Sequence, residues 1–443
     1  PEQEGTDGIR RRMYTGAELS SLLDRQRSLS QNILERIVDY GNIDKAYLKV
    51  ASNKGAGGID DMNVEELRVW LGQHFKHLQE SVLSGNYEAS PVQKVEIDKP
   101  DGGKRMLGIP TTKDRLIQQA ILQQLNLYYE PHFSENSYGF RKGRSAHQAI
   151  EQASQYVKEG KEWVVDIDLE NFFDKINHNR LMHRLSKRVG DKRLLYLIRA
   201  YLNTGIMTGG LVEQRIAGTP QGSPLSPLLS NIVLDELDKE LEKRGLSFCR
   251  YADDCNIFVG SEKSGERILQ SITNFIETKL KLKVNRLKSG VRRCSQVKFL
   301  GYTVMEAGKI RVADKSIERL KQKVKEITKR NRGVRFEQVI SEMNQAIIGW
   351  SNYFHLANTY LSDFRILDGW IRRKLRCYRL KQSGRKYSTY KLLRSLGVDE
   401  RKSWNVVMHS QGWWAMSSKV AVSQAMNVLW FSRQGLHSLY NKM

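Results

Sequence analysis

Apolar and polar positions alternate over short stretches of the first 305 residues, which predicts strands there. Val95–Lys99 and Arg105–Ile109 flank a Pro-Asp-Gly-Gly turn and predict a hairpin. Trp163–Asp168 is an apolar run with β-branched residues, so we expect another strand. Phe248–Tyr251 and Cys255–Val259 flank Ala-Asp-Asp, which predicts a second hairpin with acidic residues at its tip.

Longer stretches follow the period of an amphipathic helix, namely Arg115–Tyr129, Leu225–Lys243, Glu262–Leu280 and Ser316–Lys329. All eight prolines lie at or before Pro227, and the rest of the 443-residue chain contains none. Long helices can therefore continue there without interruption. The pattern predicts an α+β region, in which strands and helices interleave irregularly, followed by a mostly helical region.

Length and composition narrow the class of protein. With 443 residues, 40% of them hydrophobic, the chain can bury the cores of two or three domains. It has no apolar run long enough to span a membrane, and its polar first 12 residues do not resemble a secretory signal. The four cysteines form no CxxC pair and no zinc-binding spacing. This argues against a disulfide scaffold or a zinc module, and it fits a reducing cytoplasm.

The charge balance predicts a polyanionic partner. The chain has 72 Lys and Arg against 49 Asp and Glu, a net charge of +23, and nucleic acid is the usual partner for such an excess. A soluble basic protein without that partner is the alternative. Two predicted helices, Ser316–Arg332 and Asp368–Lys381, each place basic residues on one face and apolar residues on the other. We expect these basic faces to bind backbone phosphates, with solvated helices as the alternative.

Acidic residues at the ends of two predicted strands suggest a metal site. Asp253 and Asp254 lie at the tip of a hairpin, where two like charges repel unless a cation lies between them. Asp168 ends another strand, with Asp166 on the same face as a supporting carboxylate. Three carboxylates from two strands can hold two Mg²⁺ for in-line phosphoryl transfer. Taken alone, the Asp253–Asp254 pair is better explained by a solvated turn, and a helix N-cap is a plausible alternative for Asp168.

The first predicted hairpin adds an anion site. Lys99 and Arg105 are equidistant from Gly102, so they are expected to lie opposite each other or nearly so. Like charges in that position are destabilising unless an anion bridges them, and a nucleoside triphosphate is such an anion. An exposed hairpin tip is the alternative.

Four motifs occur in the order found in reverse transcriptases, and each resembles a motif of that family. They are Asp168–Asp174, Gly218–Asn231, Tyr251–Asp254 and Phe299–Tyr302, with Arg141–His147 upstream. Within the family, the chain resembles the bacterial group II intron-encoded proteins of class C, which have no endonuclease domain. The segments that carry this likeness are Lys54–Asp60, Leu107–Ala120, Gly349–Phe354 and Gly369–Arg373.

The resemblance implies an α+β right-hand polymerase fold, with fingers and a palm built on an antiparallel sheet in residues 30–305. An all-α thumb at 306–386 and a small C-terminal DNA-binding domain at 387–443 would follow. Residues 1–29 match nothing in the family. Several aromatic residues lie beyond Arg385, and we expect most of them to pack in the core of the last domain, which can contact intron RNA or target DNA.

The resemblance also assigns roles to single residues. Asp168, Asp253 and Asp254 would bind two Mg²⁺ (or Mn²⁺ in its place), and Lys288 would protonate the leaving pyrophosphate. The incoming nucleotide would be bound by Lys99, Arg105, Phe173 and Gln221, with Phe173 excluding a ribose 2′-OH. Nucleic acid would contact Arg141, Arg144, Gly301, Arg319, Lys323, Arg330, Arg372, Arg373 and Arg376. Ser223 replaces a frequent glycine of the family, but it still allows close approach of the backbone.

The implied activity is RNA-directed DNA synthesis together with help in splicing the intron RNA and inserting it into DNA. The partners would be intron RNA, an RNA template with a DNA primer, target DNA and deoxynucleoside triphosphates in a bacterial cytoplasm, without a membrane; monomer and dimer both stay open. Insertion would start from an existing 3′ end. An RNA-binding splicing cofactor without polymerase activity is one alternative, which the intact acids disfavour. A defence or diversity-generating reverse transcriptase is another, which the thumb-like segments disfavour.

Overall fold

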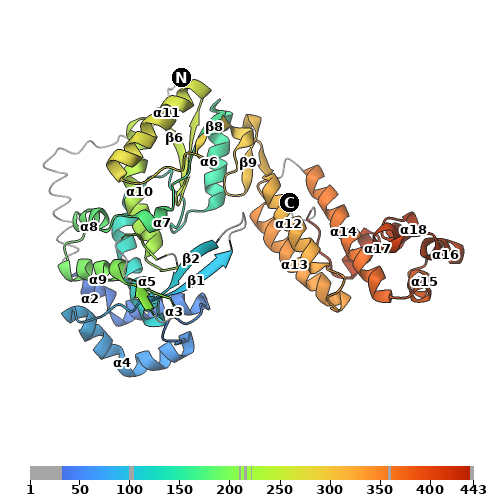
Figure 1. The fold of residues 1–443 in the computed structure, drawn as a ribbon, viewed down its shortest axis with the longest axis horizontal. Helices are drawn as coiled ribbons and strands as arrows, with labels where there is room; N and C mark the ends of the chain where they lie inside the picture. The colour runs from blue at the N-terminus through green and yellow to red at the C-terminus, as the bar shows by residue number, and fades with distance from the viewer. Residues whose placement is uncertain are drawn as a thin grey trace, which may run out of the picture. The chain divides into compact units, whose positions relative to one another are not determined.

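The computed structural model describes residues 32–98, 104–208, 211–213, 217–220, 222–357 and 361–439. The chain divides into two compact units (Figure 1). Unit 1 comprises residues 1–145, 165–257 and 266–290, and unit 2 comprises residues 146–164, 258–265 and 291–443. Each unit is therefore assembled from segments that are far apart in the sequence.

Helices form the first part of unit 1: α2 (Ile33–Ile37), α3 (Tyr40–Ser52), α4 (Val64–Ser84) and α5 (Thr112–Tyr129). A capping box starts α4, in which the Asn63 side chain accepts a hydrogen bond from the Glu66 N–H and the Glu66 side chain accepts one from the Asn63 N–H. Helix α5 packs against α3 and α2 and buries its apolar face, including Leu116 and Ile121. The predicted helix at 115–129 is confirmed, beginning three residues earlier than expected.

A four-stranded sheet in unit 1 has the order β2-β1-β4-β5. Its strands are β1 (Val92–Asp98), β2 (Lys104–Ile109), β4 (Ile206–Thr208) and β5 (Leu211–Glu213). The predicted hairpin is confirmed, because β1 and β2 pair antiparallel. The register places Arg105 opposite Ile97, so a position of Arg105 directly opposite Lys99 is excluded. Lys99 itself lies outside the described residues.

A second four-stranded sheet has the order β6-β7-β3-β8. Its strands are β6 (Ser247–Tyr251), β7 (Asp254–Val259), β3 (Trp163–Ile167) and β8 (Gly290–Arg293). The strand and the hairpin predicted from the sequence are both confirmed here. Ile167 is buried while Asp166 and Asp168 are half-buried, as alternation along a strand requires.

Between β3 and β6, the chain of unit 1 forms the helices α7 (Phe172–Lys175), α8 (His178–Ser186), α9 (Lys192–Asn203) and α10 (Ser226–Lys243). Helix α10 packs against β6, α5 and α8, and most of its positions from Leu228 to Leu237 are buried. The predicted helix at 262–280 is α11 (Glu262–Phe275), continued by a π-helical turn, Ile276–Leu280. Short 3₁₀ turns lie at Glu130–His132, Cys294–Gln296 and Glu306–Gly308.

Unit 2 begins with α6 (Ala146–Lys158), which packs against the hairpin strand β9 (Tyr302–Val304), itself paired with β10 (Ile310–Val312). After β10, the secondary-structure elements among the described residues are all helices. The helices are α12 (Asp314–Ile327), α13 (Phe336–Tyr353), α14 (Leu361–Ser383), α15 (Lys386–Ser395), α16 (Glu400–Met408), α17 (Gly412–Met416), α18 (Val420–Ala425) and α19 (Val428–Arg433). The predicted change from a mixed to a helical region is confirmed.

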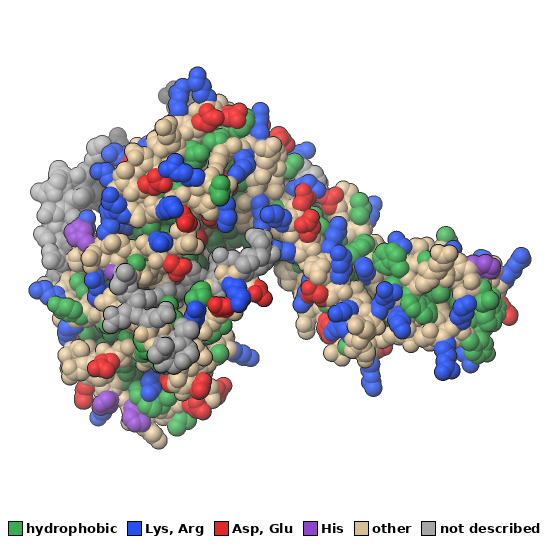
Figure 2. Space-filling model, in the orientation of Figure 1, with side chains coloured by type: hydrophobic (Ala, Val, Ile, Leu, Met, Phe, Trp, Pro, Cys, Tyr) green, Lys and Arg blue, Asp and Glu red, His purple; other side chains and the backbone are tan. Residues whose placement is uncertain are grey.

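The predicted basic face of the first thumb-like helix is confirmed. In α12, Leu320 and Val324 are buried, whereas Arg319 and Lys323 are exposed. Arg330, just after the helix, is exposed as well. Figure 2 shows Lys and Arg side chains spread over the visible face of the helical part of unit 2, with few acidic side chains between them. This surface therefore attracts anions.

The basic residues of α14 are placed differently from the expectation. Arg376 is half-buried and donates hydrogen bonds to Ser417 O at 3.1 Å and to Ser423 Oγ at 2.6 Å. Arg373 stacks on the Trp414 ring at 3.9 Å, and Arg372 pairs with the buried Asp368. These three arginines were expected to face outward and bind phosphates, but in the structure each is half-buried and packs against residues of the same unit.

All four cysteines are buried and free, so the expectation of no disulfide scaffold is confirmed. Among the described residues, no helix is both long enough and apolar enough to cross a bilayer.

Candidate functional site

The turn between β6 and β7 presents two adjacent acids. Tyr251 ends β6, Asp254 begins β7, and Asp253 and Asp254 are both half-buried. Ala252 has a φ of 59°, in the left-handed region that non-glycine residues rarely adopt. Because such a conformation persists only when its surroundings enforce it, the contacts around this turn decide where the acids point.

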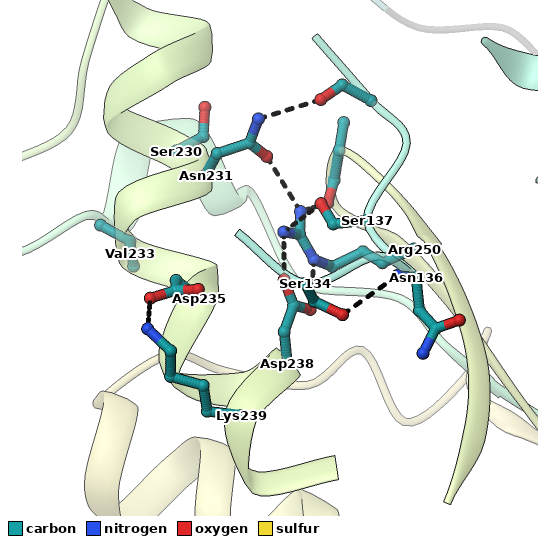
Figure 3. Close-up of polar contacts among 12 residues, drawn as sticks. Ser134, Asn136, Ser137, Ser230, Asn231, Val233, Asp235, Asp238, Lys239 and Arg250 are labelled. Atoms are coloured by element: carbon teal, nitrogen blue, oxygen red, sulfur yellow. Dashed lines mark hydrogen bonds and ion pairs between the residues drawn. The ribbon is translucent and has the colours of Figure 1, made fainter. Parts of the chain in front are cut away.

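A fully buried arginine provides the main contact to the turn. The side chain of Arg250 has 0% exposure, as has that of its ion-pair partner Asp238. Its Nε and Nη2 atoms donate to the two Asp238 oxygens at 2.6 and 2.5 Å, and its Nη1 atom donates to Ala252 O at 2.8 Å. Asn231 Oδ1 and Ser137 Oγ accept two further bonds, at 3.1 and 2.7 Å. All five N–H groups of the guanidinium therefore have acceptors (Figure 3).

The geometry of this pair maintains the charge of Arg250. Burial works to lower the pKa of Arg250, but the Asp238 carboxylate outweighs burial and raises that pKa above its ordinary value. Arg250 therefore stays a cation, with a bidentate carboxylate on one side and the carbonyl of the acidic turn on the other.

A loop of unit 1 closes around the same turn. Arg250 N–H donates to Asn136 O at 2.9 Å, and Tyr138 N–H donates to Arg250 O at 2.8 Å. Asn231 Nδ2, on α10, donates to Gly139 O at 2.9 Å. A Cβ added at Gly139 would lie 2.3 Å from Ala252 N, so only glycine allows this close approach.

Arg141 has a structural position in this loop. Only 3% of its side chain is exposed, and it pairs with Glu130 at 2.8 Å while donating to Ser137 O at 2.7 Å. A direct contact with nucleic acid, as the sequence suggested, does not fit this burial. Arg144 pairs with Glu135 and keeps 26% of its side chain exposed, so it remains accessible.

Asp168 follows β3, the strand next to β7 in the sheet. Its backbone is fixed by two hydrogen bonds: its N–H donates to Ser289 Oγ at 2.9 Å, and Asn285 N–H donates to its carbonyl at 2.8 Å. Lys288 Nζ lies 3.7 Å from Asp168 Oδ2, with 72% and 37% of the two side chains exposed. The structure therefore brings together two residues whose roles the sequence predicted separately.

The donor set suits a divalent metal, although no ligand cluster is formed. Within the described ranges, no group of three or more His, Cys, Asp or Glu side chains is placed to hold a metal ion. The predicted three-aspartate metal site therefore stays a prediction. Asp168, Asp253 and Asp254 offer carboxylate oxygens only, which is the ligand chemistry that Mg²⁺ prefers.

A cavity of about 510 Å³ lies among the described residues of unit 1. Its lining combines apolar side chains with a few polar groups and includes Leu107, Arg115, Gln119, Phe140, Phe173, Gly222 and Ser223. Phe173 is half-buried there, which differs from an ordinary core phenylalanine. Ser223 donates a hydrogen bond to Gln118, so this serine is held in place beside the cavity. Gln221, which was expected to contact the incoming nucleotide, lies outside the described residues.

Gly301 holds a tight turn in unit 2. Its φ is +84°, and a Cβ there would come within 3.2 Å of the Phe354 ring. Its carbonyl accepts hydrogen bonds from Ala313 N–H and Ser316 Oγ, both at 3.0 Å, which attach the turn to the start of α12. Close packing explains this glycine without a ligand.

Sequence reasoning did not find Asp238, and it included Asn231 only as the last residue of a motif, without a role. Both are polar residues on α10 at positions that its period directs to the buried side, and both are at most 1% exposed. A polar residue at an apolar position of an amphipathic helix is the available clue, because buried polar groups need partners.

Two family models match the chain. The first is described as reverse transcriptase (RNA-dependent DNA polymerase) and matches residues 97–304. The second is described as the maturase-specific domain of group II introns and matches residues 317–397.

Curated proteins from bacteria and yeast are similar to the chain. Protein YkfC of Escherichia coli is 32% identical over 295 residues, which cover 57% of this chain and 77% of YkfC. The group II intron-encoded protein LtrA of Lactococcus lactis is 31% identical, covering 60% of this chain and 56% of LtrA. The putative COX1/OXI3 intron 2 protein of Saccharomyces cerevisiae is 28% identical, covering 65% and 41%. The chain thus spans about three quarters of the first relative and about half of the other two.

Proposed function

Because this chain belongs to the reverse transcriptase family and carries the maturase-specific domain of group II intron proteins, we propose that it copies RNA into DNA and also binds an intron RNA to assist its splicing and insertion into DNA. The observation that carries the proposal is the acidic turn at Asp253 and Asp254, held by the buried Arg250, in the region that matches the reverse transcriptase model. The chain has the fold of that family, α+β followed by an all-helical region.

Enzymes of this family use divalent metals. In our proposal, Asp168, Asp253 and Asp254 hold two Mg²⁺, which Mn²⁺ can replace. When bound, these ions would neutralise the triphosphate and activate the primer hydroxyl. Support comes from the carboxylate donors and from their place at two neighbouring strands: Asp168 follows β3, Asp253 precedes β7 and Asp254 begins it.

The protein's own residues then bind and orient the nucleotide. Phe173 lines the cavity, and in our proposal its ring excludes a ribose 2′-OH. Lys288, next to Asp168, would donate a proton to the pyrophosphate as it leaves. Lys99, Arg105 and Gln221 remain proposed contacts to the triphosphate and the nucleotide.

Basic residues of unit 2 would bind an RNA template with its DNA primer. Arg319, Lys323 and Arg330 are exposed, and backbone phosphates are the natural partner for such a surface. Of the remaining expected contacts, Arg144 is accessible in unit 1 and Gly301 would shape the turn next to the primer. Intron RNA and target DNA complete the proposed partners.

The class C assignment and a bacterial cytoplasm are further parts of the proposal. The first rests on the sequence motifs. The second is supported by the bacterial relatives YkfC and LtrA and by four buried, free cysteines.

Primer extension on an RNA template tests the polymerase. The wild type should make DNA in the presence of Mg²⁺, and the double variant Asp253→Ala with Asp254→Ala should make none. Splicing of a candidate intron RNA, measured with both proteins, tests the second role separately. Splicing without any DNA synthesis by the wild type would leave an RNA-binding splicing cofactor as the function.

A further inference from the structure

Three aromatic side chains of unit 2 form a continuous stack. The rings of Tyr387 and Tyr390 lie 6.0 Å apart with an interplanar angle of 16°, and those of Tyr390 and Trp404 lie 4.4 Å apart at 20°. Tyr387 and Tyr390 come from α15, three positions apart, and Trp404 comes from α16, which packs against α15. We call these three residues the aromatic stack.

The aromatic stack lies at the surface, which differs from the core packing expected for most of these aromatics. Tyr387 is 56% exposed and Trp404 is 37% exposed. Single exposed aromatics are common and need no explanation. The three rings are nearly parallel and end in a tyrosine that is more than half exposed, so they form a flat platform with apolar ring surface in contact with water.

A positive charge lies over the platform, in a segment rich in basic residues. Lys391 Nζ lies 4.8 Å from the centre of the Tyr387 ring. Between residues 386 and 402 the chain has five basic residues (Lys386, Lys391, Arg394, Arg401 and Lys402) and two acidic ones, Asp399 and Glu400. All five basic residues are exposed. A ligand that combines flat rings with negative charge is complementary to this surface.

We propose that the aromatic stack binds an unpaired nucleotide of single-stranded nucleic acid, with a base stacked on Tyr387 and the adjoining phosphates near Lys391. Every base has a flat π-face, so such a platform binds with little sequence preference, and Lys or Arg neighbours supply the contact to the backbone. The inference rests on the proposed function in one respect, namely that the partner is a nucleic acid. It adds a binding site distinct from the polymerase site.

The test uses the full chain with a saturating template–primer duplex, so that the polymerase site is already occupied. Binding of labelled ten-nucleotide RNA, DNA and abasic DNA strands is measured by fluorescence anisotropy. The abasic strand has the same phosphates but no bases to stack. The variants are Tyr387→Leu, which removes the ring, and Tyr387→Phe, which keeps it. Tyr196→Leu, at a 75% exposed tyrosine on α9, is the matched control.

Tyr387→Leu should weaken binding of RNA, DNA or both by about fivefold or more, because one stacked base contributes at least that much. The strand that loses affinity identifies the natural ligand as RNA or DNA. Tyr387→Phe and Tyr196→Leu should bind like the wild type, and the abasic strand should show no difference between variants. An equal loss on the abasic strand, or no loss with Tyr387→Leu, would overturn the proposal. Primer extension by the wild type is measured alongside, so failure of the polymerase is seen separately.

Discussion

The ion pair between Arg250 and Asp238 offers a test of how the acidic turn is held. Arg250→Met leaves the Asp238 carboxylate buried without its partner and removes the donor to Ala252 O. Breaking a buried pair in this way costs about 3–5 kcal/mol, because an uncompensated charge remains in the interior. Since a domain is stable by only about 5–15 kcal/mol, this single variant loses a large part of its stability.

The double variant Arg250→Met with Asp238→Leu separates stability from positioning. Replacing both members of a buried pair by apolar residues is often neutral for stability, so most of the lost 3–5 kcal/mol (roughly) should return. The bond from position 250 to Ala252 O does not return, so the turn carrying Asp253 and Asp254 is free to shift. A misplacement of about 1 Å can cost on the order of 100-fold in rate, so kcat should stay well below that of the wild type.

Urea denaturation gives the free energy of unfolding, and primer extension under saturating nucleotide gives kcat. Arg184→Met is the matched control, because Arg184 also pairs with an acid of α10, Glu236, and its described hydrogen bonds go to α10 rather than to the turn. This control should lose stability and keep its kcat in the folded fraction. Wild-type kcat in the folded double variant would refute the positioning role of Arg250.

Three further predictions follow from the same structure. Gly139→Ala should abolish primer extension, because the new Cβ would lie 2.3 Å from the backbone of the turn, whereas Gly72→Ala, with nothing within 4 Å, should keep activity. Phe173→Ala should reduce the preference for deoxynucleotides over ribonucleotides, measured as the ratio of kcat/KM values, by about tenfold or more. Affinity for template–primer duplex should fall steeply with salt, and Lys323→Gln should reduce the slope of log K against log salt by about one.

Local patterns in the sequence predicted most of the elements correctly. Side-chain periodicity and turn residues, which are properties of neighbouring residues, predicted two hairpins, the strand before Asp168 and the basic helix α12. The acids at the second hairpin tip were found for the same reason. The pairing of Arg105 with Ile97 was missed, because register depends on how the two strands pair and not on their composition.

Only the tertiary structure decided which polar groups meet. Arg250 bonds to residues as distant in sequence as Ser137, and no local pattern indicates that partner. Basic residues that look equivalent in the sequence therefore differ in the structure: Arg141 is buried, whereas Lys323 is exposed. The sequence by itself determined the spacing of apolar residues, the net charge and the order of the motifs. The fold determined burial and partners, because both depend on contacts between segments far apart in the chain.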